Sequence, residues 1–161
     1  MILKEEITRI KEVMKIGDSD FNNWVLPSLT QLKLEYKVEH DLKGHTFFNS
    51  EKDFLNSVKN GSIINVTPKI DSNIKYRSRT KSYEDLISLI KSYRSYPKFR
   101  NEKTVDRIYD GFKNNLEMDL PIIIEFPDGS MRVFSGNTRL DIAFQLGITP
   151  KALLIQSDNF F

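Results

Sequence analysis

The sequence has no cysteine among its 161 residues, which excludes disulfide bonds, thiolate metal sites and thiol catalysis. Its two histidines, His40 and His45, lie in a turn region without a third well-spaced ligand, so they do not predict a metal site. No apolar run approaches the ~20 residues that span a bilayer. The first six residues already carry acidic and basic side chains and lack a signal-peptide pattern, so we expect a cytoplasmic protein.

Two common catalytic patterns are also missing. The sequence holds no Gly-x-x-x-x-Gly-Lys-Ser/Thr stretch, which excludes a P-loop kinase, and it offers no Ser-His-Asp arrangement. Its hydrophobic fraction of 39% allows a real core in a chain of this length. We expect an α+β fold in two parts, with an N-terminal helical extension over residues 1–30 and one domain over residues 31–161.

Helical spacing of apolar residues predicts several helices. The first ends at Gly17, and it is expected to pack on the domain or on a partner. Ser50 and Ser82 each open a further helix in the manner of a capping box. Another amphipathic pattern predicts a helix over residues 103–116.

Strands are predicted by alternation or by short apolar runs. Residues 31–40 alternate apolar and polar side chains, which indicates a half-buried strand, and residues 71–80 show no periodicity, which indicates a loop. Apolar, β-branched runs predict strands over 62–66, 120–126 and 148–156. The alternating residues of the first strand are Leu32, Leu34, Tyr36 and Val38.

Residues 131–147 predict a strand, a tight turn at Gly136 and a helix that ends at Gly147. The first N–H groups of a helix lack intrahelical partners and lie at the positive end of its dipole. A phosphate therefore fits there, and Arg139 adds a full charge. The alternative, about equally weighted, is that Gly136 only makes the turn and Asn137 or Thr138 only caps the helix.

The order of motifs over residues 62–156 resembles the N-terminal domain of the ParB and sulfiredoxin superfamily. The most specific piece is Gly-x-x-Arg, from Gly136 to Arg139, between strand and helix. In that superfamily this box holds nucleotide phosphates: CTP in ParB proteins, ATP in sulfiredoxins, and a nucleotide in the free serine kinases, which phosphorylate a hydroxyl. The resemblance implies a small mixed sheet with flanking helices. The nucleotide contacts that it implies are Ser135, Gly136, Asn137, Thr138 and Arg139, with Arg77 and Arg79 nearby.

Departures from the family pattern narrow the choice among the branches of this superfamily. Asn137 stands where sulfiredoxin needs a cysteine, so that chemistry is excluded. Partition-type ParB proteins carry more basic residues in the box and a helix-turn-helix domain after it. Gly-Asn-Thr-Arg is closer to the Gly-His-x-Arg form of the serine kinases, and residues 93–104 are similar to a run in phage proteins of this superfamily that are associated with hypermodified DNA. A phage origin, and so a host cytoplasm, is compatible with this.

The resemblance therefore favours a kinase that transfers phosphate from ATP, or another nucleoside triphosphate, with Mg²⁺ to a hydroxyl. The favoured acceptor is a hydroxymethylated pyrimidine in DNA. A carboxylate must accept the hydroxyl proton. Asp71 is the first choice because the related kinases place their acidic base in this region, and Asp141 and Glu84 are the alternatives, although all three can also be surface or capping groups.

A basic segment over residues 75–103 suits nucleic acid. It holds nine Lys or Arg against three acidic residues, a local charge of +6 in a chain of net charge +2. Tyrosines, Tyr76 among them, interleave with the cations, and exposed rings can stack on unpaired bases. The alternative is a merely solvated face. The predicted DNA contacts are Arg94, Tyr96, Lys98, Arg100 and Lys103.

Two other functions compete with the kinase. One is a non-catalytic, nucleotide-switched DNA-binding module. The other is a ParB-like nuclease, which is disfavoured because the sequence shows no cluster of carboxylates to bind its metals. Neither the base of the nucleotide nor the oligomeric state follows from the sequence.

Overall fold

The computed structural model describes residues 21–92 and 101–159. The chain divides into two compact units whose segments interleave along the sequence. Unit 1 comprises Met1–Trp24, Ser78–Met118 and Thr138–Pro150, and unit 2 comprises Val25–Arg77, Asp119–Asn137 and Lys151–Phe161. The helix expected before Gly17 lies outside the described residues, and the division expected at residue 30 stays a prediction.

Unit 1 is built from helices. Ser82 and Asn101 begin two of them, because their side chains accept hydrogen bonds from the N–H groups of Asp85 (3.1 Å) and Thr104 (3.0 Å). Both helices confirm the sequence prediction to within three residues. The elements are α5 (Tyr83–Lys91), α6 (Glu102–Lys113) and α7 (Asn137–Gln145), of which α7 belongs to unit 1 from Thr138 onward.

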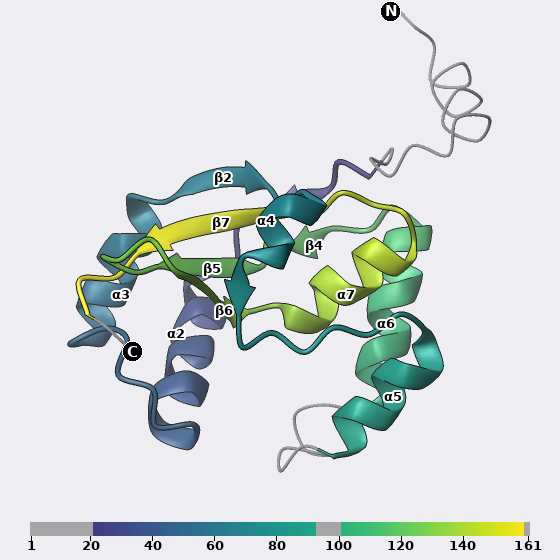
Figure 1. The fold of residues 1–161 in the computed structure, drawn as a ribbon, viewed down its shortest axis with the longest axis horizontal. Helices are drawn as coiled ribbons and strands as arrows, with labels where there is room; N and C mark the ends of the chain where they lie inside the picture. Colours follow the sequence, from purple (N-terminus) through teal and green to yellow (C-terminus); the bar gives the residue numbers. More distant parts are fainter. Residues whose placement is uncertain (1–20, 93–100, 160–161) are drawn as a thin grey trace, which may run out of the picture. The chain divides into compact units, whose positions relative to one another are not determined.

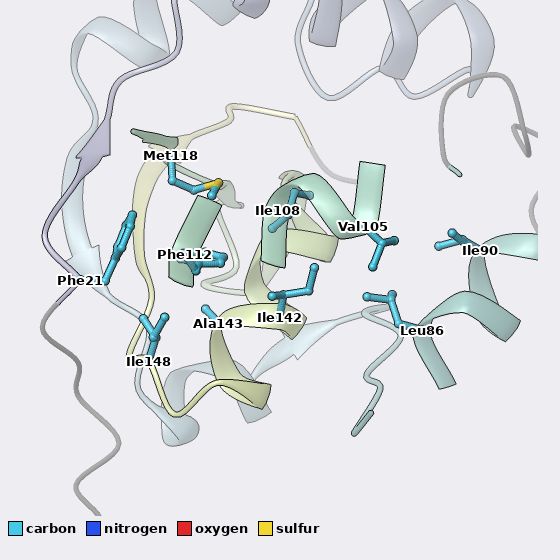
Figure 2. Close-up of a cluster of buried hydrophobic side chains, with 10 residues drawn as sticks. All are labelled: Phe21, Leu86, Ile90, Val105, Ile108, Phe112, Met118, Ile142, Ala143 and Ile148. Carbon is cyan, nitrogen blue, oxygen red and sulfur yellow. The ribbon is translucent and has the colours of Figure 1, made fainter. Parts of the chain in front are cut away.

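Apolar side chains from these helices form one buried cluster (Figure 2). Three aromatic rings pack edge to face at one part of it: Phe112 lies 4.9 Å from Phe21 and 5.4 Å from Trp24, measured between ring centroids. The cluster therefore ties residues just after the undescribed N-terminal segment to α6. Its buried members are Phe21, Leu86, Ile90, Val105, Ile108, Phe112, Met118, Ile142, Ala143 and Ile148.

Unit 2 is built on a five-stranded mixed sheet in the order β2-β7-β5-β6-β3 (Figure 1). The central strand β5 runs parallel to β7 and antiparallel to β6. Its residues Ile122, Ile123 and Ile124 are all 0% exposed, as expected for a strand covered on both faces. The strands are β2 (Ser62–Asn65), β3 (Ile74–Lys75), β5 (Ile122–Glu125), β6 (Met131–Ser135) and β7 (Lys151–Gln156).

Two helices of unit 2, α2 (Leu29–Lys37) and α3 (Glu51–Lys59), pack against one face of this sheet (Figure 1). Phe54 of α3 is 0% exposed and stacks on Phe134 of β6 with ring centroids 4.7 Å apart. The mixed sheet with its helices confirms the α+β class.

The remaining elements are short. They are β1 (Trp24–Val25), which pairs with β4 (Met118–Asp119), the π-helical turn η1 (Val38–Leu42) and α4 (Pro68–Ser72).

The strand predicted over residues 31–40 is wrong, because these residues continue α2 and enter η1. The Ser28 hydroxyl accepts a hydrogen bond from the Gln31 N–H at 3.1 Å and so begins a helix. Leu32 is 7% exposed whereas Leu34 is 53% exposed, so alternate residues do not share a buried face as a half-buried strand requires. The alternation in the sequence is incidental.

The other elements predicted within the described residues are confirmed, with one adjustment. The capping box at Ser50 begins α3, and the strands predicted over 62–66, 120–126 and 148–156 correspond to β2, β5 and β7 with shorter ends. Residues 71–80, predicted as a loop, contain the end of α4 and the short strand β3 before the irregular chain. The short strand exists because Ile74 pairs with Met131 along the parallel edge of β6.

Candidate functional site

The strand β6 leads into α7 through one glycine. Gly136 has a φ of 94°, a left-handed conformation that glycine adopts without steric strain. α7 begins at the next residue, Asn137, so the predicted order of strand, tight turn and helix is confirmed. The sequence predicts that the N–H groups of the first helical turn bind an anion, and that role stays a prediction.

Arg77 joins two of the predicted residues in unit 2. Its side chain is 1% exposed, its Nε donates to Asp71 Oδ1 at 2.6 Å, and its Nη1 donates to Asn137 Oδ1 at 3.0 Å. The guanidinium therefore lies beside the first residue of α7. A cation buried this deeply needs such partners, because an uncompensated buried charge is strongly destabilising.

Asp71 is part of this arrangement rather than a loop residue. It belongs to α4, which Thr67 begins by accepting a hydrogen bond from the Ile70 N–H at 3.3 Å. The Asp71 side chain is 13% exposed. Its contact with Arg77 shows that Asp71 orients the guanidinium, a structural role that exists beside any role in proton transfer.

A second carboxylate next to the box is Glu35, which the sequence analysis missed. The Ser135 hydroxyl donates to Glu35 Oε2 at 3.1 Å, and Gln31 Nε2 donates to Glu35 Oε1 at 3.3 Å. The strand predicted over residues 31–40 gives no reason to single out Glu35. The i, i+4 spacing of Gln31 and Glu35 on a helix is the signal that indicates their contact.

Thr138 and Arg139 of the predicted box are half-buried. The Arg139 nitrogens Nε and Nη2 are buried, so Arg139 is not the fully solvent-facing side chain that an open phosphate site suggests.

Asp141, one of the predicted alternatives for the proton acceptor, has a structural role in unit 1. It is 1% exposed, and its Oδ2 accepts hydrogen bonds from the Thr80 hydroxyl (2.7 Å) and the Thr80 N–H (3.2 Å). Gln145 Nε2 donates to Thr80 Oγ1 at 3.2 Å, and the Tyr109 hydroxyl donates to Gln145 Oε1. Burial raises the pKa of Tyr109, with smaller contributions from nearby acidic residues. This network holds the chain before α5 against α7 and makes Asp141 a poor candidate for contact with substrate.

Tyr76, at the end of β3, is an exposed aromatic residue in an unusual conformation. Its φ of 58° is left-handed, which costs a bulky side chain on the order of 1–3 kcal/mol, and it is 76% exposed. The guanidinium carbon of Arg132 lies 5.2 Å from the centre of the Tyr76 ring and 5.1 Å from that of Phe47. Arg132 thus lies over both rings as a cation–π partner.

The remaining predicted residues are exposed or undescribed. Arg79, Glu84 and Lys103 are exposed, with Glu84 in the first turn of α5 and Lys103 in the first turn of α6. Four predicted DNA contacts, Arg94, Tyr96, Lys98 and Arg100, lie outside the described residues. The DNA interface therefore stays a prediction.

The described residues contain neither a cluster of metal ligands nor a helix that could span a membrane. Among residues 21–92 and 101–159, no group of three or more His, Asp or Glu side chains gathers as a metal site would require. Over the same residues, no helix has the length and apolar character needed to cross a membrane.

Comparison with known proteins leaves the site to be interpreted from its own geometry. No protein-family model matches the chain, and neither a curated protein nor a solved structure is significantly similar to it.

Proposed function

We propose that the protein is a nucleotide-dependent phosphotransferase of the ParB and sulfiredoxin type that phosphorylates a hydroxyl. The favoured acceptor is a hydroxymethylated pyrimidine in DNA. The observation that carries this proposal is the buried guanidinium of Arg77, held by Asp71 and Asn137 beside the turn from β6 into α7. Backbone N–H groups at a helix start suit a phosphate, and Arg77 supports them by holding Asn137, the first residue of α7.

The residues fit a nucleotide and its metal ion. Mg²⁺ usually binds through one or two carboxylates together with substrate phosphates, so a cage of three protein ligands is not needed. Asp71 would supply such a carboxylate, and bound Mg²⁺ would neutralise charge on the transferred phosphate. The role of Arg77 would be to keep Asn137 in place, so that the N–H of this first residue of α7 can hold a phosphate in one orientation.

Two carboxylates compete for the role of proton acceptor. Asp71 is the first candidate, and this is supported by its contact with Arg77, which also contacts Asn137. Glu35 is the second, since its contact with the Ser135 hydroxyl brings it to the same end of β6. A general base contributes about 10²–10⁴-fold to the rate, so the residue that fills this role is identified by its effect on transfer.

The experiment is a transfer assay with γ-labelled ATP and either ordinary or hydroxymethylated DNA. The wild-type protein is expected to label only the hydroxymethylated DNA. Glu35→Gln and Asp71→Asn are compared with Arg107→Ala, a matched control that removes an exposed cation from α6. If Glu35 is the base, Glu35→Gln is expected to retain nucleotide binding and to lose transfer about 10²–10⁴-fold. Asp71→Asn is expected to weaken Mg²⁺-dependent nucleotide binding as well, because Asp71 also holds Arg77.

A non-catalytic, nucleotide-switched DNA-binding module is the second candidate, because the same arginine and helix start can bind phosphate without chemistry. It replaces the kinase if nucleotide binds but no hydroxyl acceptor is labelled. Nucleotide affinity that is unchanged in Arg77→Lys removes the site assignment itself, since lysine cannot make both contacts of the guanidinium.

A further inference from the structure

The ring of Tyr76 is presented to solvent at a conformational cost. Its neighbours Ile74 and Arg77 are 3% and 8% exposed, so both are anchored in unit 2, and the chain must reverse between them. Glycine would adopt the φ of 58° without strain. A bulky side chain kept exposed in such a conformation points to function, because residues in sparsely populated backbone regions cluster at binding and active sites.

Arg132 supports one side of this ring. Lys75 pairs with Arg132 in the register of β3 and β6, which brings the arginine under Tyr76. The same guanidinium lies over buried Phe47, and its Nη2 is 3.4 Å from His45 Nε2. These contacts hold the arginine in place, so the ring is fixed before any ligand arrives.

We propose that Tyr76, supported by Arg132, is a stacking platform for a nucleobase. A flat, electron-rich ring fixed by a cation behind it offers its exposed side to a planar heteroaromatic group, and base-on-tyrosine stacking is the common form of that contact. A polyphosphate without a base has no π-system and therefore cannot stack on the ring. The exposure of 76% leaves room for the base.

The distance between the Tyr76 platform and the predicted phosphate box suits a single nucleotide. Arg132 lies on β6 four residues before Gly136, which directly follows the strand, and this corresponds to about 13 Å at about 3.3 Å per residue. Tyr76 directly precedes Arg77, whose Nη1 contacts Asn137 at the start of α7. A sugar and its phosphate chain can span this separation, so one ligand can stack its base and place its phosphates, the latter part resting on the proposed function.

The first arm of the test compares ATP with inorganic tripolyphosphate, which lacks a base. Calorimetry on the wild-type protein is expected to give about 5- to 150-fold tighter binding of ATP, the equivalent of one stacked base. Tyr76→Gly is expected to remove this preference and to leave tripolyphosphate binding unchanged. Because glycine relieves the strain, the variant should unfold no more easily than the wild type.

A matched control is Asn115→Gly. Among the described residues, Asn115 is the one other non-glycine residue with a positive φ, at 55°. The control relieves backbone strain without touching Tyr76 or Arg132, so the preference for ATP should remain. Tyr76→Trp should retain or increase the preference, since the larger ring stacks at least as well.

The second arm determines where the base comes from. An oligothymidylate and an abasic oligonucleotide of the same length differ only in bases, and a preference for the former that Tyr76→Gly removes assigns the platform to an unpaired DNA base. Equal binding of ATP and tripolyphosphate, together with equal binding of the two oligonucleotides, overturns the platform. Failure to bind either triphosphate overturns the proposed phosphate box instead, and the oligonucleotide arm still decides the platform.

Discussion

Hydrogen-bonded polar side chains have different roles in unit 1 and at the candidate site of unit 2. In unit 1, Thr80, Asp141 and Gln145 form hydrogen bonds to one another and to nearby backbone, which anchors a chain segment to α7. In unit 2, Arg77 and Glu35 bring their contacts to Asn137 and Ser135, which flank Gly136. The comparison indicates that the hydrogen bonds around Asp141 stabilise the helical unit, whereas the contacts of Arg77 and Glu35 join residues of the candidate site in the sheet unit.

The two apolar cores differ as well. Unit 1 buries side chains between helices, with Phe112 among edge-to-face rings, whereas unit 2 buries them between a sheet and two helices, with Phe54 stacked on Phe134. Each cluster draws its members from one unit alone. This separation predicts that damage to one core remains local.

The largest expected effect tests that separation. Phe54→Ala and Phe112→Ala each remove a buried ring, and each is expected to lower the free energy of unfolding by about 3–5 kcal/mol. Hydrogen exchange measured by peptide is the informative probe. Phe54→Ala should reduce protection in β5, β6 and β7, while Phe112→Ala should reduce it in α5, α6 and α7.

An equal loss of protection across all described elements in both variants would contradict the separation of the two cores, because it means that they unfold as one cooperative unit. Leu116→Ala serves as the control. Leu116 is 55% exposed, so its truncation is expected to change stability by less than about 0.5 kcal/mol.

A smaller effect is expected from Asp141→Asn, which tests whether Asp141 has a structural or a catalytic role. Asp141→Asn weakens the contacts to Thr80, and the loss of charge-assisted hydrogen bonds is expected to cost about 1.5–3 kcal/mol of stability. Nucleotide affinity and phosphate transfer, measured at a temperature where the variant remains folded, should equal those of the wild type. Transfer reduced about 10²-fold or more in the folded variant returns Asp141 to the list of proton acceptors.

Local signals in the sequence predicted much of the fold. Ser50 and Ser82 begin their helices through hydrogen bonds to residues three positions ahead, and Gly136 makes its turn through its own backbone freedom. Such features depend on a few neighbouring residues, so a sequence can show them. The strand prediction for residues 31–40 was wrong because their pattern of apolar and polar side chains is compatible with both a helix and a strand. Which of the two forms depends on the side chains that the sheet covers, and the sequence does not show this.

The candidate site was predicted only as separate parts. Arg77 and Asn137 were both named, but their contact spans 60 residues, and that of Glu35 and Ser135 spans 100. No spacing rule in a single sequence connects residues so far apart. The strained φ of Tyr76 was equally hidden, because it arises from the burial of Ile74 and Arg77 on either side.

The smallest expected effect is a pH dependence that belongs to unit 2. Asp128 lies in the turn between β5 and β6, where its Oδ1 accepts hydrogen bonds from the Ser130 hydroxyl (2.6 Å) and the Ser130 N–H (2.9 Å). These bonds, led by that from the hydroxyl, lower the pKa of Asp128 below its ordinary value of 3.8. The folded state therefore favours the ionised form, and Asp128 stabilises the protein at every pH above that value.

This contribution is lost as the pH falls through the lowered pKa of Asp128, because the unfolded chain then binds the proton more readily than the folded turn does. Asp128→Asn retains an acceptor oxygen but cannot titrate, so its stability should decline less steeply than that of the wild type below pH 3.8. Thermal unfolding from pH 7 to pH 2 measures the two slopes. Hydrogen exchange at acidic pH should place the difference in β5 and β6 and not in α5 or α6, whereas parallel slopes mean that the Ser130 contacts do not distinguish the two states of the carboxyl group.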